Sequence, residues 1–393
     1  MSQHNAHQSE SFTLQIIFFQ VRNFVNNGHW HPECCKETVI QKIESNTVKS
    51  NTAQKPMRLG FVALNDAAPF MLARELGVFA KHGLDVHLSR ELGWASIRDR
   101  VATRALTAAQ ALVGLPFSAR SHEERFIVPL VTSLQGNGIT VSNQYHDEGC
   151  NTPSTILRQH KKRKSSRPPT FAVVSRYGSH LLLIRKWLQS AGVDPKTEVN
   201  IVVLPPPQMV PHLRAGHIDG YCVGEPWNTV GVMAGIGFCV ATSAELLPCH
   251  PEKVLMMAES FVDQNRDQTL RLVLALLEAC KMCETPEMLP VVSQILSHHD
   301  YLNLSAEILL DSLQGNIIRQ SNSSLDSVRP FMMFSGSGMN EPDAKKAEWA
   351  HQKFVEAGVF DRVELDSTVF YKRLFRSDFY NEASSILESR EAF

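Results

Sequence analysis

The sequence predicts an α/β protein made of two α/β units in series. From Met57 onward, short apolar runs alternate with amphipathic stretches, as expected for strands that alternate with helices. After Cys150 a polar, basic segment at 158–169 interrupts this rhythm, which then restarts. The 393 residues match two domains of roughly 100–200 residues each. Two units joined by crossings near 134–140 and 244–253 indicate two lobes with a cleft between them.

The first unit has clear strand and helix signals. We expect strands and apolar runs at 59–64, 84–88, 108–114 and 126–134, and helices at 65–83 and 94–103. In the helix at 65–83, Asp66 suits an N-cap, Pro69 lies in the first turn and Gly83 suits a stop. The glycines of QGNGITVS mark a bend after the fourth run.

The second unit repeats the alternation and leads into a helical C-terminal part. We expect strands at 170–174, 200–207, 218–223, 237–243 and 252–260, and helices at 179–192, 208–216 and 225–235. From Gln264 onward the pattern is mainly helical. No repeat of 20–50 residues is visible, which argues against a solenoid.

Composition narrows the classes of function. Lysine and arginine total 39 and aspartate and glutamate total 40, so no overall charge favours nucleic acid or an anionic membrane. The eight cysteines lack the spacing of a disulfide scaffold and indicate free thiols in a reducing compartment. No stretch approaches about 18 uninterrupted apolar residues, so we expect no membrane span.

The first 56 residues differ from the rest. Residues 1–56 are rich in His, Asn, Gln, Ser and Thr, and we expect a poorly ordered N-terminal extension. The apolar run SFTLQIIFF at 11–19 has no preceding Lys or Arg and no small-residue cleavage site after it. We therefore expect no secretory signal and a cytoplasmic protein; a different N-terminus would favour the periplasm.

Several expected helices begin directly after loops rich in Gly or Ser. Trp94 follows Gly93, His180 follows YGS, and Pro226 follows Gly224 and Glu225. Helix N-termini expose unpaired N–H groups, so three of them turned towards one cleft would bind an anion. The alternative is that these are ordinary helix caps, with Trp94 in the core and His180 solvated. Lys253, in HPEK, would by the same reasoning be an exposed lysine at a strand end.

The segment GYCVGEPWN at 220–228 places one carboxylate among special residues. Glu225 and Pro226 fit the first turn of a helix, where a carboxylate and a proline are both favoured. We therefore expect no catalytic role for Glu225. Gly224, which has no side chain, would let an anion approach the backbone N–H groups at the helix start.

Enzymatic and metal-binding signatures are missing. Cys280 and Cys283 lack the further ligands of a metal site and fit the core of an amphipathic helix. The basic run 161–167 has no interleaved aromatic residues and fits a solvated loop better than an RNA or lipid contact. The chain has no GxSxG, P-loop, HExxH or GxGxxG motif. We expect no enzyme and no cofactor.

Four segments together resemble a known family. The segment from LGFVALNDAAPF to WASIRDR, LPPPQMV, YCVGEPWN and HPEK are similar to the nitrate- and bicarbonate-binding proteins of the NrtA/CmpA type, which are solute receptors of ABC transporters. The resemblance runs from about residue 57 to 300. It implies a two-lobed, type II periplasmic-binding-protein-like fold with a ligand cleft between the lobes. Lobe I would comprise 57–134 and 250–393, and lobe II 135–249.

The resemblance also implies a ligand site. Carried over by motif, the family's nitrate-binding residues become Trp94, Asn137, His180, Gly224 and Lys253. Bicarbonate-binding members carry a glutamate where Lys253 stands, so a cation there favours nitrate or nitrite. Asn137 stands where transport proteins have a glutamine that is one methylene longer, which could change pocket size or favour nitrite. Nitrate only accepts hydrogen bonds, so indole, amide and ammonium donors suit it.

The resemblance leaves three functions open. The first is a cytosolic nitrate/nitrite sensor of the NasS type, which holds an RNA-binding antiterminator partner until ligand arrives; LSRELGWASIRDR, NGITVS and Asn137 look closer to this type. The alternative is the substrate-binding component of a nitrate/nitrite ABC transporter. A remote alternative is an enzyme like the thiamine pyrimidine synthases, with Lys253 as a Schiff-base lysine.

Overall fold

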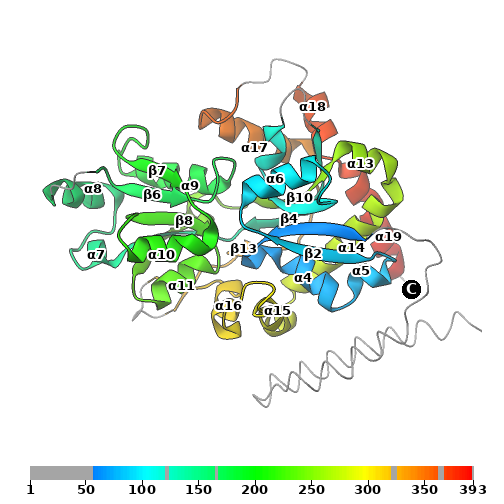
Figure 1. The fold of residues 1–393 in the computed structure, drawn as a ribbon, viewed down its shortest axis with the longest axis horizontal. Helices are drawn as coiled ribbons and strands as arrows, with labels where there is room; N and C mark the ends of the chain where they lie inside the picture. The colour runs from blue at the N-terminus through cyan, green and yellow to red at the C-terminus, as the bar shows by residue number, and fades with distance from the viewer. Residues whose placement is uncertain (1–55, 120–123, 164–166, 320–324, 362–366, 392–393) are drawn as a thin grey trace, which may run out of the picture.

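The computed structural model describes residues 56–119, 124–163, 167–319, 325–361 and 367–391. These residues form two β-sheets, each flanked by helices, at opposite ends of an elongated molecule (Figure 1). The predicted α/β architecture is therefore confirmed. The N-terminal extension predicted for 1–56 lies, apart from Pro56, outside the described residues.

The larger sheet has six strands. Its order is β13-β4-β10-β3-β1-β2. The strands are β1 (Met57–Val62), β2 (Val86–Glu91), β3 (Ala108–Leu112), β4 (Phe126–Gln135), β10 (Pro251–Ala258) and β13 (Met332–Met333). β1 runs parallel to β2 and β3, whereas β10 runs antiparallel to its neighbours β3 and β4. The carboxyl ends of β1 and β3 therefore meet the start of β10 at one edge of the sheet.

The smaller sheet has five strands in the order β7-β6-β8-β5-β9. They are β5 (Asn137–Ser142), β6 (Thr170–Val173), β7 (Asn200–Val203), β8 (Gly220–Gly224) and β9 (Gly237–Thr242). β6 pairs in parallel with β7 and β8, and β5 pairs antiparallel with β8 and β9. A separate two-stranded ribbon joins β11 (Asn316–Ile318) and β12 (Leu325–Ser327).

Helices cover both sheets (Figure 1). Those up to β9 are α4 (Ala68–Glu75), α5 (Val78–Lys81), α6 (Trp94–Ala102), α7 (Asn143–His146), α8 (Pro153–Lys162), α9 (Ser179–Ser190), α10 (Met209–Arg214) and α11 (Trp227–Met233). The later ones are α12 (Ser243–Leu246), α13 (Glu259–Gln264), α14 (Arg266–Glu284), α15 (Leu289–Leu296), α16 (Ala306–Leu313), α17 (Ala344–Glu356), α18 (Ser367–Leu374) and α19 (Ser377–Glu391). Single 3₁₀ turns are η2 (Asn65–Ala67), η3 (Leu115–Ser118), η4 (Pro206–Gln208) and η5 (Pro286–Met288).

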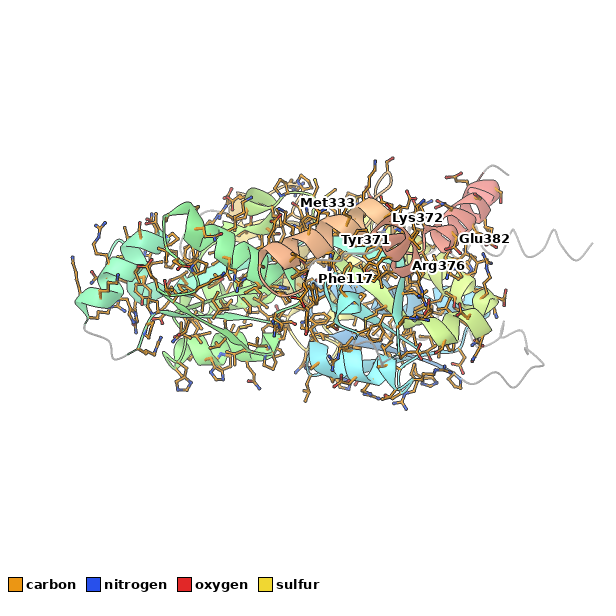
Figure 2. The ribbon with its side chains drawn as sticks, turned by 90° about the horizontal axis from the view of Figure 1, so that it is seen from above. Phe117, Met333, Tyr371, Lys372, Arg376 and Glu382 are labelled. Atoms are coloured by element: carbon orange, nitrogen blue, oxygen red, sulfur yellow. The ribbon has the colours of Figure 1, made fainter. Side chains whose placement is uncertain are left out.

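The C-terminal helices return to the six-stranded sheet. α14 and α19 pack on each other and on β4. Phe117 lies against the rings of His351 and Phe375, and it appears with Tyr371 beside α17 in Figure 2. α15 and α16 lie between the lobes in Figure 1, where α15 contacts α4 and α16 contacts α11.

The chain passes between the sheets where β4 leads into β5 and where β9 leads towards β10. Gln135 and Gly136 both have positive φ angles, of 59° and 86°. A Cβ at Gly136 would lie 2.6 Å from the Met332 side chain, so both its backbone and its surroundings favour glycine. This tight bend turns the chain from one sheet into the other.

Two local predictions were wrong. The helix predicted over 65–83 is divided into η2, α4 and α5, because Gly77 adopts a left-handed conformation (φ 72°) between the two α-helices. Asp66 caps no helix: the N-cap of α4 is Ala67, which makes no side-chain cap bond. The Asp66 side chain is instead buried in the interior.

The basic run 161–167, predicted as a solvated loop, begins in a helix, and residues 164–166 lie outside the described residues. α8 extends to Lys162 and begins with a capping box formed by Thr152 and Thr155. Arg163 donates a 2.6 Å hydrogen bond to Glu148, so the positive charge of this arginine has an acidic partner nearby.

The core position predicted for two cysteines is confirmed. Cys280 and Cys283 lie in the core, with at most 1% exposure. Within the described ranges, no helix combines the length and apolarity needed to cross a membrane.

Candidate functional site

A fully buried lysine marks the edge where the carboxyl ends of β1 and β3 meet the start of β10. Lys253 has 0% exposure. Its Nζ lies 2.6 Å from Asp66 Oδ2 and 2.7 Å from Glu252 Oε1. Burial disfavours the charged ammonium, yet the two carboxylates outweigh it and raise the pKa of Lys253. Lys253 is therefore a buried cation and not the exposed strand-end lysine that its sequence position also allowed.

Glu252 connects the two lobes through hydrogen bonds. Its Oε2 accepts from Asn137 Nδ2 at 2.8 Å, and Ser179 Oγ donates to the same oxygen. His250 Nε2 lies 3.1 Å from this oxygen as well. Burial opposes ionisation of Glu252 and is the largest single effect, but Lys253, His180 and His250 together outweigh it and hold the pKa of Glu252 well below its usual range. A buried anion with this many donors is the centre of the arrangement.

Asp66 is the second carboxylate beside Lys253. Its Oδ1 accepts a 2.7 Å hydrogen bond from Gln110 Nε2. Here burial is the stronger effect: it raises the pKa of Asp66 despite the nearby Lys253. The two carboxylates on one ammonium therefore differ, because the pKa of Glu252 is lowered by its charged and hydrogen-bonding neighbours, whereas burial raises the pKa of Asp66.

His180 lies in the first turn of α9 and is completely buried. Neither ring nitrogen has a hydrogen-bond partner in the part of the chain that the structure describes, and Nε2 lies 3.9 Å from Glu252 Oε1. Burial lowers the pKa of His180 to about 3. The imidazole is therefore neutral at physiological pH, with one N–H free to donate.

Trp94 lies in the first turn of α6 and is 2% exposed. Its indole N–H has no hydrogen-bond partner among the described residues. Lys253 Nζ lies 5.5 Å from the centre of the indole ring system. An unpaired, buried donor beside a buried cation is what a site for an acceptor ligand requires.

Asn137 and Gly224 complete the arrangement from the smaller sheet. They face each other in register on β5 and β8. A Cβ on Gly224 would lie 3.3 Å from Asn137 Oδ1 and 3.4 Å from a Leu64 methyl carbon, so a larger residue would press on its neighbours. Contacts thus link all five predicted site residues, directly or through Glu252 and Asp66, although their role in ligand binding stays a prediction.

Sequence reasoning missed several members of this site. Asp66 was assigned to a helix cap, and four others were not considered: Gln110, Ser179, His250 and Glu252. A signal existed for Glu252, which precedes Lys253 in HPEK. Neighbouring residues of a regular strand point to opposite faces, but the pairing of β10 with β4 is irregular between Pro251 and Val254. The Glu252 and Lys253 side chains consequently meet.

Glu225 lies outside this group of contacts. It is buried, and its Oε2 accepts from the backbone N–H of Thr229 at 3.2 Å. α11 begins only at Trp227, with Pro226 as its N-cap, so Glu225 precedes the helix and does not belong to its first turn. Burial raises the pKa of Glu225 to about 7, although the Thr229 N–H opposes the shift.

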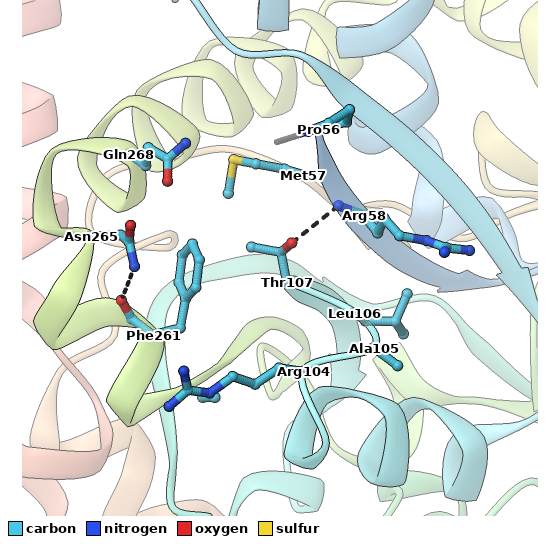
Figure 3. A pocket seen from close by; sticks show the side chains of 11 residues that line it. Pro56, Met57, Arg58, Arg104, Ala105, Leu106, Thr107, Phe261, Asn265 and Gln268 are labelled. Carbon is cyan, nitrogen blue, oxygen red and sulfur yellow. Dashed lines mark hydrogen bonds between the residues drawn. The ribbon is translucent and has the colours of Figure 1, made fainter. Parts of the chain in front are cut away.

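An open cavity of about 430 Å³ lies elsewhere, at the other end of the larger sheet (Figure 3). It is lined by the start of β1, the loop before β3 and the end of β10, including Met57, Thr107 and Ala258. The opposite side of the cavity is formed by Phe261 on α13, Gln268 on α14, and Asn265, which lies between these two helices. None of the five predicted site residues lines this cavity.

The family follows from a match over most of the described chain. The model of the NMT1-like family matches residues 50–297. The chain belongs to this family. The match covers the five-stranded sheet, every strand of the six-stranded sheet except β13, and all five predicted site residues.

Curated relatives support the predicted NrtA/CmpA type. The nitrate/nitrite binding protein NrtA of Synechococcus elongatus is 31% identical over 347 residues, covering 85% of this chain and 78% of the relative. The nitrate import ATP-binding protein NrtC of Synechocystis is 33% identical over 83% of this chain. The bicarbonate transport ATP-binding protein CmpC of Synechococcus elongatus is 36% identical over 75%. The chain spans only 49% and 44% of these two ATP-binding relatives.

Solved structures confirm the predicted two-lobed fold. The periplasmic nitrate-binding protein NrtA from Synechocystis PCC 6803 superposes with a TM-score of 0.79 at 26% identity, covering 86% of this chain and 90% of that one. A ligand-binding component of an ABC-type import system from Staphylococcus aureus gives 0.67 at 15% identity, covering 84% and 99%, which shows the fold alone. The type II binding-protein architecture is therefore established for this chain.

Proposed function

We propose that this protein binds nitrate or nitrite between its lobes, at the buried cluster around Lys253. The observation that carries this proposal is the set of unpaired polar groups there: the Trp94 indole N–H and both ring nitrogens of His180 have no hydrogen-bond partner within the described ranges. These groups and the Lys253 ammonium come from both lobes, since Trp94 and His180 lie in the first turns of α6 and α9 and Lys253 lies on β10. The relatives named as nitrate/nitrite binding proteins support the same ligand class.

The chemistry of the site fits a small oxoanion. A singly charged, planar anion offers acceptors around its edge, and the indole, imidazole and ammonium groups supply donors. The site excludes water, so each charge-assisted hydrogen bond is stronger than at a surface. Closure of the lobes on the anion would then convert ligand concentration into the population of one conformation.

The biological role forms a finer part of the proposal. We propose a cytoplasmic nitrate/nitrite sensor that controls a regulatory partner, such as an RNA-binding antiterminator. The second candidate is a receptor for an ABC transporter, which the similarity to NrtC and CmpC favours. Cell fractionation, with affinity purification against a candidate antiterminator and the candidate ATP-binding subunits, separates the two roles. Stable association with the transporter subunits alone would refute the sensor.

An enzymatic role finds little support. A Schiff-base lysine needs a neutral amine, usually obtained by a lowered pKa. Burial alone would lower the pKa of Lys253, but Asp66 and Glu252 raise it instead. The relatives named above as NrtA are binding proteins by name.

Calorimetric titration of the purified protein with nitrate, nitrite, bicarbonate and sulfate tests the proposed ligand. We expect heat and a thermal shift with at least one nitrogen oxoanion. Absence of both signals with nitrate and with nitrite would refute the proposal.

Replacing the buried cation should abolish binding. Lys253→Glu places a third carboxylate beside Asp66 and Glu252, so an attraction for the anion becomes a repulsion. We expect at least a 100-fold loss of nitrate affinity, on the order of 3 kcal/mol or more. Lys353→Glu is the matched control, because Lys353 pairs with Glu356 on the surface.

Circular dichroism establishes that the Lys253→Glu variant is folded before titration. If that variant does not fold, Lys253→Met removes the charge without adding a carboxylate and takes its place. Unchanged nitrate affinity in a folded variant of either kind would show that Lys253 is not a ligand.

A further inference from the structure

The site contains two amide oxygen atoms that have no hydrogen-bond donor among the described residues. Asn137 Nδ2 is directed to Glu252, which leaves Asn137 Oδ1 without a donor. Gln110 Nε2 is directed to Asp66, which leaves Gln110 Oε1 without one. The orientation of the Asn137 amide is fixed, because the Glu252 carboxylate, whose pKa is held low, can only accept a hydrogen bond from the NH₂ group.

Two oxygen atoms, Asn137 Oδ1 and the Asp66 carboxylate oxygen that pairs with Lys253, border the space beside Gly224. A Cβ built on Gly224 would lie 3.3 Å from Asn137 Oδ1 and 3.7 Å from Asp66 Oδ2. Nitrate and nitrite have acceptors only, so on this side oxygen would face oxygen without a hydrogen between them. A buried acceptor left without a donor costs about 1–3 kcal/mol. The N–H groups of Trp94 and His180 do not reduce this cost, because in the occupied site they donate to the anion and not to the oxygen atoms of the protein.

The charges of the site also oppose the binding of an anion that brings no hydrogen. Lys253 is already shared by Asp66 and Glu252, so an added anion brings three negative groups to one ammonium. His250 faces an acceptor with each ring nitrogen, Leu247 O at 2.6 Å and Glu252 Oε2 at 3.1 Å. In the occupied site the three negative groups therefore exceed the single positive charge of Lys253. Such a buried charge is costly without a compensating proton or cation.

We infer that the oxoanion occupies this site together with one acidic hydrogen, which lies between the anion and the Asp66 carboxylate. The inference rests on the proposed function, because it concerns how the same site accepts its anion. The hydrogen has two possible sources: an O–H group of the anion itself, as in bicarbonate, or a proton that Asp66 takes from solvent when nitrate or nitrite binds.

Asp66 is the carboxylate best placed to receive this hydrogen. The charged and titratable groups facing it are Lys253 and Glu252 on β10, and Gln110 on β3 bonds its other oxygen. Glu252 is bonded to several donors and its pKa is held well below its usual range, whereas burial raises the pKa of Asp66. A protonated Asp66 keeps the bond from Gln110 at Oδ1 and gains an O–H to offer the anion.

Other groups near this cluster have partners of their own or lie farther along the network. Around His180 they are Glu252, Lys253 and His250. Further titratable groups lie on elements that pack on α9: Cys222 on β8, His160 on α8 and Glu245 on α12. His160 is hydrogen-bonded to Tyr145, and Glu245 pairs with Arg319. Glu225 bonds Thr229 instead of Lys253, which makes it a suitable control.

Proton uptake during anion binding tests the inference directly. Titrations in buffers of different ionisation enthalpy, from about pH 5.5 to about pH 9, count the protons taken up per anion. With nitrate or nitrite we expect uptake that approaches one proton within this range. The bound anion raises the pKa of Asp66 further. The affinity for nitrate or nitrite should therefore rise as pH falls, and it should level off below the pKa that Asp66 has before the anion binds. Bicarbonate should bind without uptake at the alkaline end.

Two variants assign the proton to a residue. Asp66→Asn replaces the carboxylate with an amide that already carries hydrogens, so nitrate binding should persist without proton uptake and with little dependence on pH. Glu225→Gln removes the other buried carboxylate with a raised pKa, and uptake should remain. If Asp66→Asn does not fold, the uptake by the unmodified protein and by Glu225→Gln still decides the question.

The outcomes separate this inference from the proposed function. Nitrate or nitrite binding without proton uptake at any pH in the range overturns the inference and leaves the proposed function standing. Uptake that persists in folded Asp66→Asn, or disappears in Glu225→Gln, overturns the assignment to Asp66. Absence of binding by either nitrogen oxoanion overturns the proposed function and this inference with it.

Discussion

The two ends of the six-stranded sheet differ in the burial and pairing of their polar groups. At one end, Lys253, Glu252 and Asp66 are at most 1% exposed and bonded to one another. At the other end, the same strands border an open cavity of about 430 Å³ lined by groups such as Thr107 and Gln268 (Figure 3). The visible cavity and the concentration of buried charge therefore lie at opposite ends.

This difference shows that burial of charge is the better guide to the site here. Removing ions from water costs several kcal/mol each, and their mutual attraction often only balances that cost. A fold has little stability reason to keep such a group, so an unpaired donor set beside it indicates a ligand. Substitutions at the two ends should therefore differ in how much unfolding free energy and nitrate affinity they remove.

Removing the central carboxylate should be the most damaging change. Glu252→Ala leaves the Lys253 ammonium with one partner and removes the acceptor of Asn137, Ser179 and His250. We expect a loss of about 3–5 kcal/mol in the free energy of unfolding, measured by urea denaturation. Glu356→Ala, which removes an exposed partner of Lys353, should cost less than about 1 kcal/mol. Equal losses would contradict the comparison.

Glu225 should make stability depend on pH. Burial raises its pKa to about 7, so the contribution of Glu225 to stability is full at low pH and is lost as pH rises through about 7. Glu225→Gln has no such titration. Relative to the natural protein, the variant should gain roughly 1–3 kcal/mol in unfolding free energy between about pH 4.5 and about pH 8. A constant difference over that range would show that Glu225 is not a titrating, buried carboxylate.

A change in the open cavity should have the smallest effect. Gln268 is 8% exposed, and its amide lines the cavity. Gln268→Leu keeps the size of the side chain, so we expect a change of less than about 0.5 kcal/mol in unfolding free energy. Nitrate affinity should be unchanged in calorimetry. A large loss of affinity would mean that the two ends of the sheet are energetically coupled.

The sequence by itself predicted the architecture and much of the candidate site. Alternation of apolar runs with amphipathic stretches is a local property, so the α/β class and most elements could be read from it. Motif resemblance supplied Trp94, His180 and Lys253, which contacts now link into one buried cluster. The division of the helix at 65–83 was missed, because Gly77 also fits a continuous helical pattern.

Only the tertiary structure decided the charge state and partners of the site. Asp66 looked like a helix cap, and its contact with Lys253 joins residues that are 187 positions apart in the chain. No local pattern encodes such a contact, since it depends on how β10 enters the sheet beside β3. Burial then acts on these groups through the surrounding low dielectric, raising the pKa of Asp66 and leaving His180 neutral. Sequence thus named the donors for an anion, whereas folding determined that the cation among them is already shared by two carboxylates.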